Sequence, residues 1–197
     1  MKVIDLNLQV MSMLSKNWSS DVCGSIESLD LKKIENAVEV LKKARDNENQ
    51  VFIFGNGGGN GTHFASDLFK IGKIKAICLN DNIPLVSAYT NDDGWENVYV
   101  EQLKILMNKG DIVIVQSVHG GRGRDNAGNW SENLTKAVDY ANKIGKTISI
   151  VGFDGGILKE ISTVCIHIKA DSTPIVESLQ NLVHHIITFE LSDGSRK

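Results

Sequence analysis

A histidine and an aspartate, His63 and Asp67, stand four residues apart directly after the glycine-rich stretch GNGGGNG. Residues at this spacing lie on one face of a helix, so the two side chains would meet there. An imidazole beside a carboxylate can transfer protons or bind a metal ion. The pair is therefore the first candidate for chemistry, and the alternative is a histidine that only caps or covers the start of a helix.

The glycine-rich stretch follows the apolar run VFIFG, which begins at Val51, and so lies at a strand-to-helix turn. Backbone N–H groups in such a turn, together with the helix N-terminus, can approach an anion closely. A turn that only reverses the chain is the alternative. We predict that this one binds an anionic part of a substrate through Asn56, Gly57, Gly58 and Gly59.

A bound dinucleotide is a weaker alternative for the same turn. The fingerprint of that ligand requires glycine or alanine at the sixth position, but counting from Gly55 gives Asn60 and counting from Gly57 gives Thr62. Asp81, just beyond the second apolar run, keeps the nucleotide interpretation open.

A second glycine-rich segment, SVHGGRGRDNAGNW, begins at Ser117, where the apolar run IVIVQS ends. Ligands of open α/β sheets bind at the carboxyl ends of the strands. Ser117, the backbone after it and the helix start near Ser131 therefore form a second candidate anion site. Arg122 and Arg124 are the most concentrated positive charge in the second half of the chain, and a solvated surface loop is the alternative.

The final helical segment, Thr173–Leu191, carries two adjacent histidines, His184 and His185. Neighbouring residues of a helix point about 100° apart, so at most one of them faces a given site. His185 lies eight residues after Glu177 and on roughly the same side. We expect His184 to pack or to face solvent.

Short apolar runs alternate with segments of helical spacing along most of the chain. The runs are rich in β-branched residues and apolar on both faces, as buried parallel strands are. The predicted strands are 51–55, 75–79, 112–117, 147–153 and 164–168, and the predicted helices between and after them are 63–71, 96–107, 131–144, 157–160 and 173–191. This alternation predicts an α/β fold, a three-layer sandwich with a five-stranded parallel sheet.

Two amphipathic helices are expected before the first strand, over residues 4–14 and 31–44. Their apolar stripes must be buried either against the chain's own sheet or against a second subunit, and both alternatives stay open. We expect a single domain, 1–197, with N-terminal helices over 1–48 and an α/β core over 49–197.

Composition narrows the functional classes. The chain has 197 residues, 42% of them hydrophobic, and a formal net charge of -3, which excludes disorder as the main state. A pI near 5.9 argues against direct nucleic-acid binding. No apolar run approaches the ~20 residues that cross a bilayer, and the first residues lack a signal peptide. With three widely spaced cysteines, these features predict a cytoplasmic protein without a membrane partner.

Four segments occur in an order that resembles a known family. They are GNGG leading into HFASDL, SAYTNDDGWENVY from Ser87, GDIVIVQS from Gly110 and TPIVESLQNLVHHII from Thr173. Together they resemble the sugar isomerase (SIS) domain, a flavodoxin-like fold, of the phosphoheptose isomerase family over essentially the whole chain. The resemblance implies an aldose–ketose isomerase that interconverts sedoheptulose 7-phosphate and D-glycero-D-manno-heptose 7-phosphate through an enediol. It also implies a homotetramer whose N-terminal helices pair between subunits, with active sites near the interfaces.

The resemblance assigns roles to particular residues. It implies that Asp67 and His185 are the catalytic proton carriers, with Asp67 standing where the family has Glu. It further implies zinc as a cofactor, held by His63, Asp67, Glu177 and His185, with Glu177 at a family Gln position. Eight helical residues span ~12 Å. Glu177 and His185 would therefore share an ion only through an irregular helix or separate subunits, or else the ion contacts some of the four residues.

The implied substrate site departs from the family pattern. Gly59 and His119 stand where the family has serines, and an insertion precedes Asn129. Arg122, Arg124 or His119 could replace the lost hydroxyls with charge, or the loop could accept a larger substrate. The substrate-binding residues expected from this resemblance and the two glycine-rich segments are Asn56, Gly57, Gly58, Gly59, Asp92, Ser117, His119, Arg122, Arg124, Ser131 and Thr173.

Three other functions remain as alternatives to this one. The first is a non-catalytic SIS protein that binds phosphosugars or assists assembly, including one that binds a replication initiator. The second is an isomerase of a different sugar phosphate. The third is a nucleotide-dependent oxidoreductase, against which the imperfect glycine spacing speaks.

Overall fold

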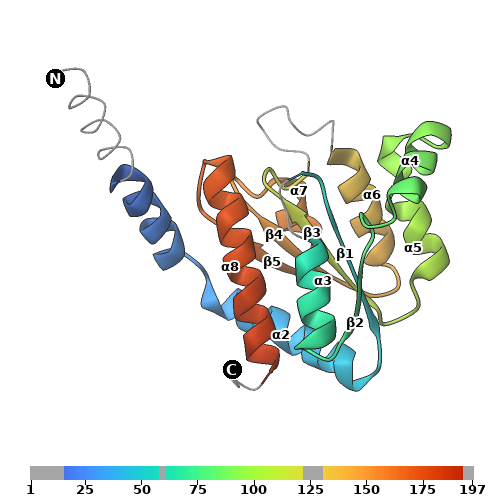
Figure 1. The fold of residues 1–197 in the computed structure, drawn as a ribbon, viewed down its shortest axis with the longest axis horizontal. Helices are drawn as coiled ribbons and strands as arrows, with labels where there is room; N and C mark the ends of the chain where they lie inside the picture. Colours follow the sequence, from blue (N-terminus) through green and yellow to red (C-terminus); the bar gives the residue numbers. More distant parts are fainter. Residues whose placement is uncertain (1–15, 58–60, 122–130, 193–197) are drawn as a thin grey trace, which may run out of the picture.

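The computed structural model describes residues 16–57, 61–121 and 131–192 (Figure 1). Its centre is a sheet of five parallel strands in the order β2-β1-β3-β4-β5. The strands are β1 Gln50–Gly55, β2 Lys75–Cys78, β3 Ile112–Ser117, β4 Lys146–Val151 and β5 Val164–His167. All five predicted strands and the predicted parallel α/β sandwich are thus confirmed.

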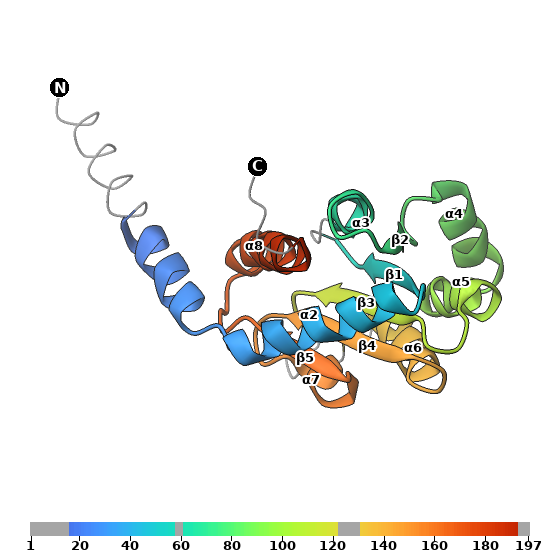
Figure 2. The same cartoon turned by 90° about the horizontal axis from the view of Figure 1, so that it is seen from below.

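Helices cover both faces of the sheet, which is why its central strands are apolar on both sides (Figure 2). One layer holds α2 Leu31–Asp46, α3 Gly61–Lys70 and α8 Thr173–Leu191. The other layer holds α4 Ile83–Asp92, the 3₁₀ turn η1 Trp95–Asn97, α5 Val100–Leu106, α6 Glu132–Ala141 and α7 Gly156–Ile161. None of the helices in the described part of the chain is long and apolar enough to cross a membrane.

The strand order brings the two glycine-rich turns together. Strand β2 lies on one side of β1 and β3 lies on the other, so β1 and β3 are neighbours. The turns that follow them begin side by side and lead to helices on opposite faces of the sheet, α3 and α6. Gly55 stands opposite Gln116 in the register of these strands. A crevice at such a switch in strand order is where open α/β sheets bind ligands.

Helix α2 buries its apolar stripe against its own subunit. Asp30 caps the helix by accepting hydrogen bonds from the N–H groups of Lys32 (3.0 Å) and Lys33 (3.4 Å). The helix packs on β1, β5 and α8 through Ile34, Ala37, Val38, Leu41 and Ala44. For this helix, the chain's own sheet is therefore the partner.

Several helices differ from the prediction. Helix α4 was not predicted; none of its residues is fully buried, and only Val86 and Tyr89 pack, partly buried, against the core. Its start has a local signal instead, since Asn82 accepts from the N–H of Leu85 and Pro84 occupies the first turn. The predicted helix 96–107 is divided into η1 and α5. Residues 16–27 form a further, largely exposed helix that was not predicted, and the predicted helix 4–14 lies outside the described residues.

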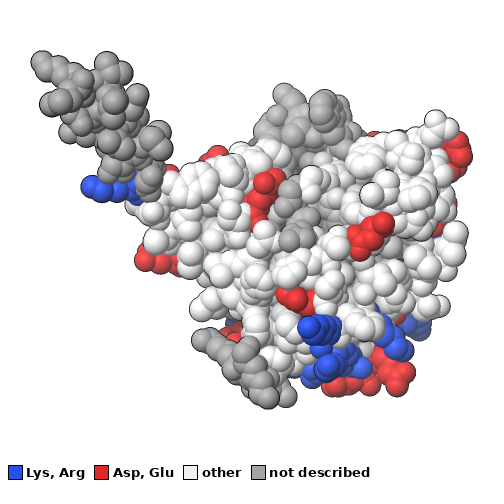
Figure 3. All heavy atoms as spheres, viewed as in Figure 1, with Lys and Arg blue, Asp and Glu red and all other residues white. Residues whose placement is uncertain are grey.

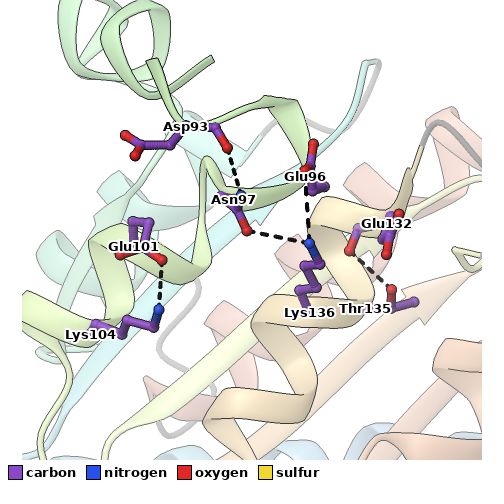
Figure 4. A network of polar contacts seen from close by, with 8 residues as sticks. All are labelled: Asp93, Glu96, Asn97, Glu101, Lys104, Glu132, Thr135 and Lys136. Atoms are coloured by element: carbon purple, nitrogen blue, oxygen red, sulfur yellow. Dashed lines mark hydrogen bonds and ion pairs between the residues drawn. The ribbon is translucent and has the colours of Figure 1, made fainter. Parts of the chain in front are cut away.

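Lys136 of α6 connects this helix to η1 within the same helix layer (Figure 4). Its Nζ atom lies 3.4 Å from Asn97 Oδ1 and 3.9 Å from Glu96 Oε1. Asn97 in turn donates a hydrogen bond of 2.6 Å to the carbonyl of Asp93. Contacts of this exposed kind contribute roughly 0–1 kcal/mol each, so they orient η1 on α6 more than they stabilise the fold.

Candidate active site

Helices α3 and α8 bring together three residues that sequence analysis singled out. His63 Nε2 lies 3.3 Å from Asp67 Oδ2 and 3.2 Å from His185 Nε2, and His185 Nε2 lies 3.8 Å from the same carboxylate oxygen. His63 and Asp67 are one turn apart on α3, as predicted, and His185 approaches from α8. A carboxylate oxygen therefore faces two imidazole nitrogens from different helices.

The three side chains differ in exposure. The side chain of Asp67 is 16% exposed, whereas those of His63 and His185 are 48% and 49% exposed. The carboxylate is thus enclosed while both imidazoles meet solvent. All three side chains are thus at least partly accessible to solvent.

The three donors suit a zinc ion. Two imidazoles and one carboxylate form a ligand set that catalytic zinc uses while keeping a fourth position open. Ligand atoms ~2.05 Å from a tetrahedral ion stand ~3.3 Å from one another, and the three separations here run from 3.2 to 3.8 Å. The group His63, Asp67 and His185 could therefore hold the ion with little movement.

Glu177, the fourth expected ligand, does not join this group among the described residues. Helix α8 runs as one α-helix from Thr173 to Leu191, so an irregular start does not bring Glu177 toward His185. Within this subunit the described residues therefore offer three potential metal ligands, His63, Asp67 and His185.

His184 points into the core, in agreement with the expectation that it packs. It is fully buried, and its ring stacks on Phe64 of α3 with centroids 4.2 Å apart and planes 3° apart. Burial, and to a smaller extent the nearby His185 and His63, lower the pKa of His184 to about 3. The ring is consequently neutral near pH 7.

The glycine-rich turn after β1 is tied to the start of α6 by a pair of amides. Asn56 and Asn133 each donate to the other's side-chain oxygen, at 2.9 Å in both directions. Gly57 has a φ of +77°, which favours glycine. The amide of Asn56, predicted to bind substrate, thus joins the two candidate anion sites, while Gly58 and Gly59 lie outside the described residues.

Two further side chains hold the first carbonyl of this turn. Tyr99 Oη donates to the carbonyl of Gly55 at 2.9 Å, and Asn80 Nδ2 donates to the same carbonyl at 3.1 Å and to Tyr99 Oη at 2.7 Å. Sequence analysis missed Tyr99, Asn80 and Asn133. Their positions in the sequence were the available signal, because Asn80 follows a strand and Tyr99 and Asn133 lie at helix starts. Polar residues at such positions often lie at the carboxyl edge of the sheet, where ligands bind.

Burial raises the pKa of Tyr99 to about 12. We therefore expect Tyr99 to ionise about two pH units above the ordinary tyrosine value, and Tyr99→Phe to remove that late step. Phenolate absorbance at 295 nm during an alkaline titration measures this. Because the folded state keeps this proton above the unfolded pKa, its contribution to stability is present below pH ~10 and is lost as the pH rises toward 12. A titration curve unchanged by Tyr99→Phe would contradict the assignment.

The second candidate anion site begins with a turn that Ser117 closes. Its Oγ accepts hydrogen bonds from the N–H groups of Gly120 (3.0 Å) and Gly121 (3.3 Å). His119 packs on Phe153, with ring centroids 4.2 Å apart. The hydroxyl of Ser117 therefore shapes the turn, and its predicted contact with substrate stays a prediction.

The remaining predicted residues are placed as follows. Ser131 precedes α6 as its N-cap residue, and Thr173 begins α8. Asp92 ends α4 in the other helix layer, where its carboxylate accepts a hydrogen bond from Asn91, and α4 lies far from α8 in both views (Figures 1 and 2). The subunit does not bring Asp92 to the group of His63, Asp67 and His185. Arg122 and Arg124 lie outside the described residues.

Asp81, which kept a nucleotide interpretation open, serves the start of α3. Its Oδ1 accepts a hydrogen bond of 2.5 Å from Thr62 Oγ1. On the face that carries α3 and α8, acidic atoms form small separate groups, and the basic atoms gather at the lower edge except for one group at the left beside the projecting helix (Figure 3). The described residues of this face therefore form no broad basic surface for nucleic acid.

Known proteins resemble the chain in sequence over most of its length. A phosphoheptose isomerase from Helicobacter pylori (strain P12) is 33% identical over 171 residues, which cover 83% of this chain and 84% of that protein. The chain belongs to the phosphoheptose isomerase family. Another phosphoheptose isomerase, from Geotalea daltonii, is 32% identical over 163 residues, or 79% of this chain and 80% of that protein. No family model matches the chain.

The fold of the phosphoheptose isomerase family is also found by structural comparison. A solved phosphoheptose isomerase from Neisseria gonorrhoeae superposes with a TM-score of 0.81 at 22% identity, covering 95% of this chain and 99% of that one. The expected SIS fold is thereby confirmed. In this member of the phosphoheptose isomerase family, the group of His63, Asp67 and His185 on α3 and α8 is the candidate active site.

Proposed function

We propose that this protein isomerises a phosphorylated sugar between its aldose and ketose forms, with sedoheptulose 7-phosphate and D-glycero-D-manno-heptose 7-phosphate as the pair. The observation that carries the proposal is the carboxylate of Asp67 within 3.3 and 3.8 Å of two imidazoles from different helices. Membership of the phosphoheptose isomerase family supports the same reaction.

The reaction requires a base at carbon and a proton carrier at oxygen. Asp67 would remove the proton from the carbon next to the carbonyl, which leaves an enediol. His185 would move a proton between the two oxygens, and returning the first proton to the neighbouring carbon completes the isomerisation. The carboxylate and the imidazole belong to facing helices, so one substrate could lie between them.

Zinc would fit the same residues. His63, Asp67 and His185 would hold it, and when bound it would polarise a sugar oxygen as a Lewis acid. Glu177 could contribute only from a second subunit, because one straight helix carries both it and His185.

The two glycine-rich turns are the proposed phosphate site. The Asn56–Asn133 amide pair ties the first turn to the start of α6, which follows the second glycine-rich segment, at the carboxyl edge of the sheet. Backbone N–H groups of such turns would bind the phosphate. Ser117, His119, Ser131 and Thr173 lie on the segments around this edge, and Arg122 and Arg124 would add charge from the inserted loop.

We further propose a cytoplasmic homotetramer. The helix over residues 16–27 stands away from the body of the subunit (Figure 2). Trp18 is 43% exposed on this helix, and Leu31, at the start of α2, is 64% exposed. Apolar side chains on a projecting helix are suited to pairing between subunits. A second subunit could also bring its Asp92 or Glu177 to the group of His63, Asp67 and His185.

An isomerisation assay in D₂O tests the proposed chemistry. Incubation with sedoheptulose 7-phosphate should yield the aldose with deuterium at the carbon next to the carbonyl, because the enediol exchanges its proton with solvent through Asp67. Proton NMR measures both conversion and deuterium content, and other sugar phosphates run in parallel identify the preferred substrate. Conversion without deuterium would exclude an exchanging enediol, and no conversion of any sugar phosphate would favour a non-catalytic SIS protein.

A further inference from the structure

His184 contacts the helix that carries the other two site residues. Its ring stacks on Phe64, the residue after His63, with centroids 4.2 Å apart. On the outer side, His185 Nε2 lies 3.2 Å from His63 Nε2. Helices α3 and α8 therefore meet twice at the same level, through a buried pair and through the pair of site imidazoles.

Gln116 connects His184 to the sheet. It is the penultimate residue of β3, 2% exposed, and its Nε2 atom lies 2.6 Å from His184 Nε2. A Cβ added at Gly55 would lie 2.7 Å from the carbonyl oxygen of Gln116, so the same residue packs under the glycine-rich turn. One hydrogen bond thus joins α8 to β3, the strand that leads into the second glycine-rich segment and packs against Gly55 of the first.

One turn before His184, Gln180 Nε2 donates a buried hydrogen bond of 2.9 Å to the carbonyl of Ile150 in β4. The Gln116 bond adds a second such tie at the level of His185, which the ring stack alone would not supply. A side-chain tip lies ~5–6 Å from its helix axis, so a rotation of about 20° moves it by ~2 Å. A hydrogen bond depends steeply on direction and distance, and it resists such a rotation where an apolar contact does not. Active sites need their groups held within about 0.5 Å.

We propose that His184 is a positioning residue, which fixes His185 relative to Asp67 by holding α8 to α3 through Phe64 and to β3 through Gln116. The inference rests on the proposed function, because it concerns the same three site residues. His184 touches no substrate and acts through His185.

Three variants separate positioning from stability. His184→Phe keeps the ring stack but leaves the Gln116 amide buried and unpaired, and Gln116→Leu leaves the His184 nitrogen unpaired. Each should lower the melting temperature by about 5 °C. The double variant removes both partners, so it should recover most of the melting temperature, because neither member of the pair is then buried without the other.

Positioning predicts that function does not recover with stability in the double variant. We expect kcat for sugar-phosphate isomerisation to fall about tenfold with KM changed less than twofold. We also expect the affinity of the His63, Asp67 and His185 group for Co²⁺ alone, followed by its visible absorption, to fall 10–100-fold. Thr188→Val is the matched control, since Thr188 is buried one turn further along α8 and should leave both values unchanged.

Each outcome decides the proposal. A double variant with wild-type kcat and wild-type Co²⁺ affinity would overturn it, and so would equal losses in Thr188→Val. If the wild type turns over no sugar phosphate, the proposed function fails while the Co²⁺ titration still tests the positioning. If the wild type binds no Co²⁺, the kcat of the double variant tests the positioning. If the wild type neither binds Co²⁺ nor isomerises a sugar phosphate, the three residues have no function that His184 could support, and the inference is wrong.

Discussion

Replacing Asp67 with Asn is expected to lower kcat for sugar-phosphate isomerisation by about 100- to 10,000-fold, the range that a positioned acid or base contributes. The amide keeps the size of the carboxylate but cannot accept the proton from carbon. His185→Ala should lose a similar factor, because the enediol oxygens would lack their proton carrier. Steady-state kinetics on the folded variants, with folding checked by circular dichroism, measure both effects.

Two further variants sharpen this result. Ser66→Ala changes the residue beside Asp67. The Ser66 hydroxyl donates to the Thr62 carbonyl, and its loss should leave kcat within about twofold, because replacing a neutral, exposed side chain has little effect on neighbouring residues. Asp67→Glu restores the family residue, and retained or increased activity would show that the site keeps the family's geometry. Wild-type rates in both Asp67→Asn and His185→Ala would show that the proposed mechanism is wrong.

Replacing His63 with Ala is expected to weaken zinc binding by at least about 100-fold. Loss of outer partners of metal ligands already costs 10–100-fold in affinity, and loss of one of three direct donors should cost no less. Zinc content by elemental analysis after dialysis, and competition with a chromophoric chelator, provide the measurement.

His167→Ala is the matched histidine control. His167 is the last residue of β5, and its Nε2 atom lies 2.7 Å from the carbonyl oxygen of Phe153. It is not part of the group of His63, Asp67 and His185. Zinc content should therefore stay at the wild-type level in this variant. Zinc near zero in the wild type, or equal zinc content in wild type and His63→Ala, would mean that the three residues form a proton-transfer site and no metal site.

Local patterns in the sequence were enough for most of the framework. The β-branched runs gave the five strands because a strand buried on both faces must be apolar throughout. Helix α8 was predicted to its observed ends because Ser172 and Pro174 mark its start and an apolar face continues to Leu191. Helix α4 escaped prediction because none of its residues is fully buried, and hydrophobic periodicity reports only buried faces.

The sequence by itself determined that His63 and Asp67 share a helix face, because a spacing of four residues fixes their relation inside one element. The family resemblance had already pointed to His185 and not His184, and the tertiary structure brings His185 to the pair. Only the tertiary structure decided that Glu177 stays outside the group within this subunit and that Asp92 lies in the other helix layer. The same holds for the Asn56–Asn133 pair, whose members are 77 residues apart. Distances between elements depend on strand order and on how helices rotate as they pack, and no local spacing records either.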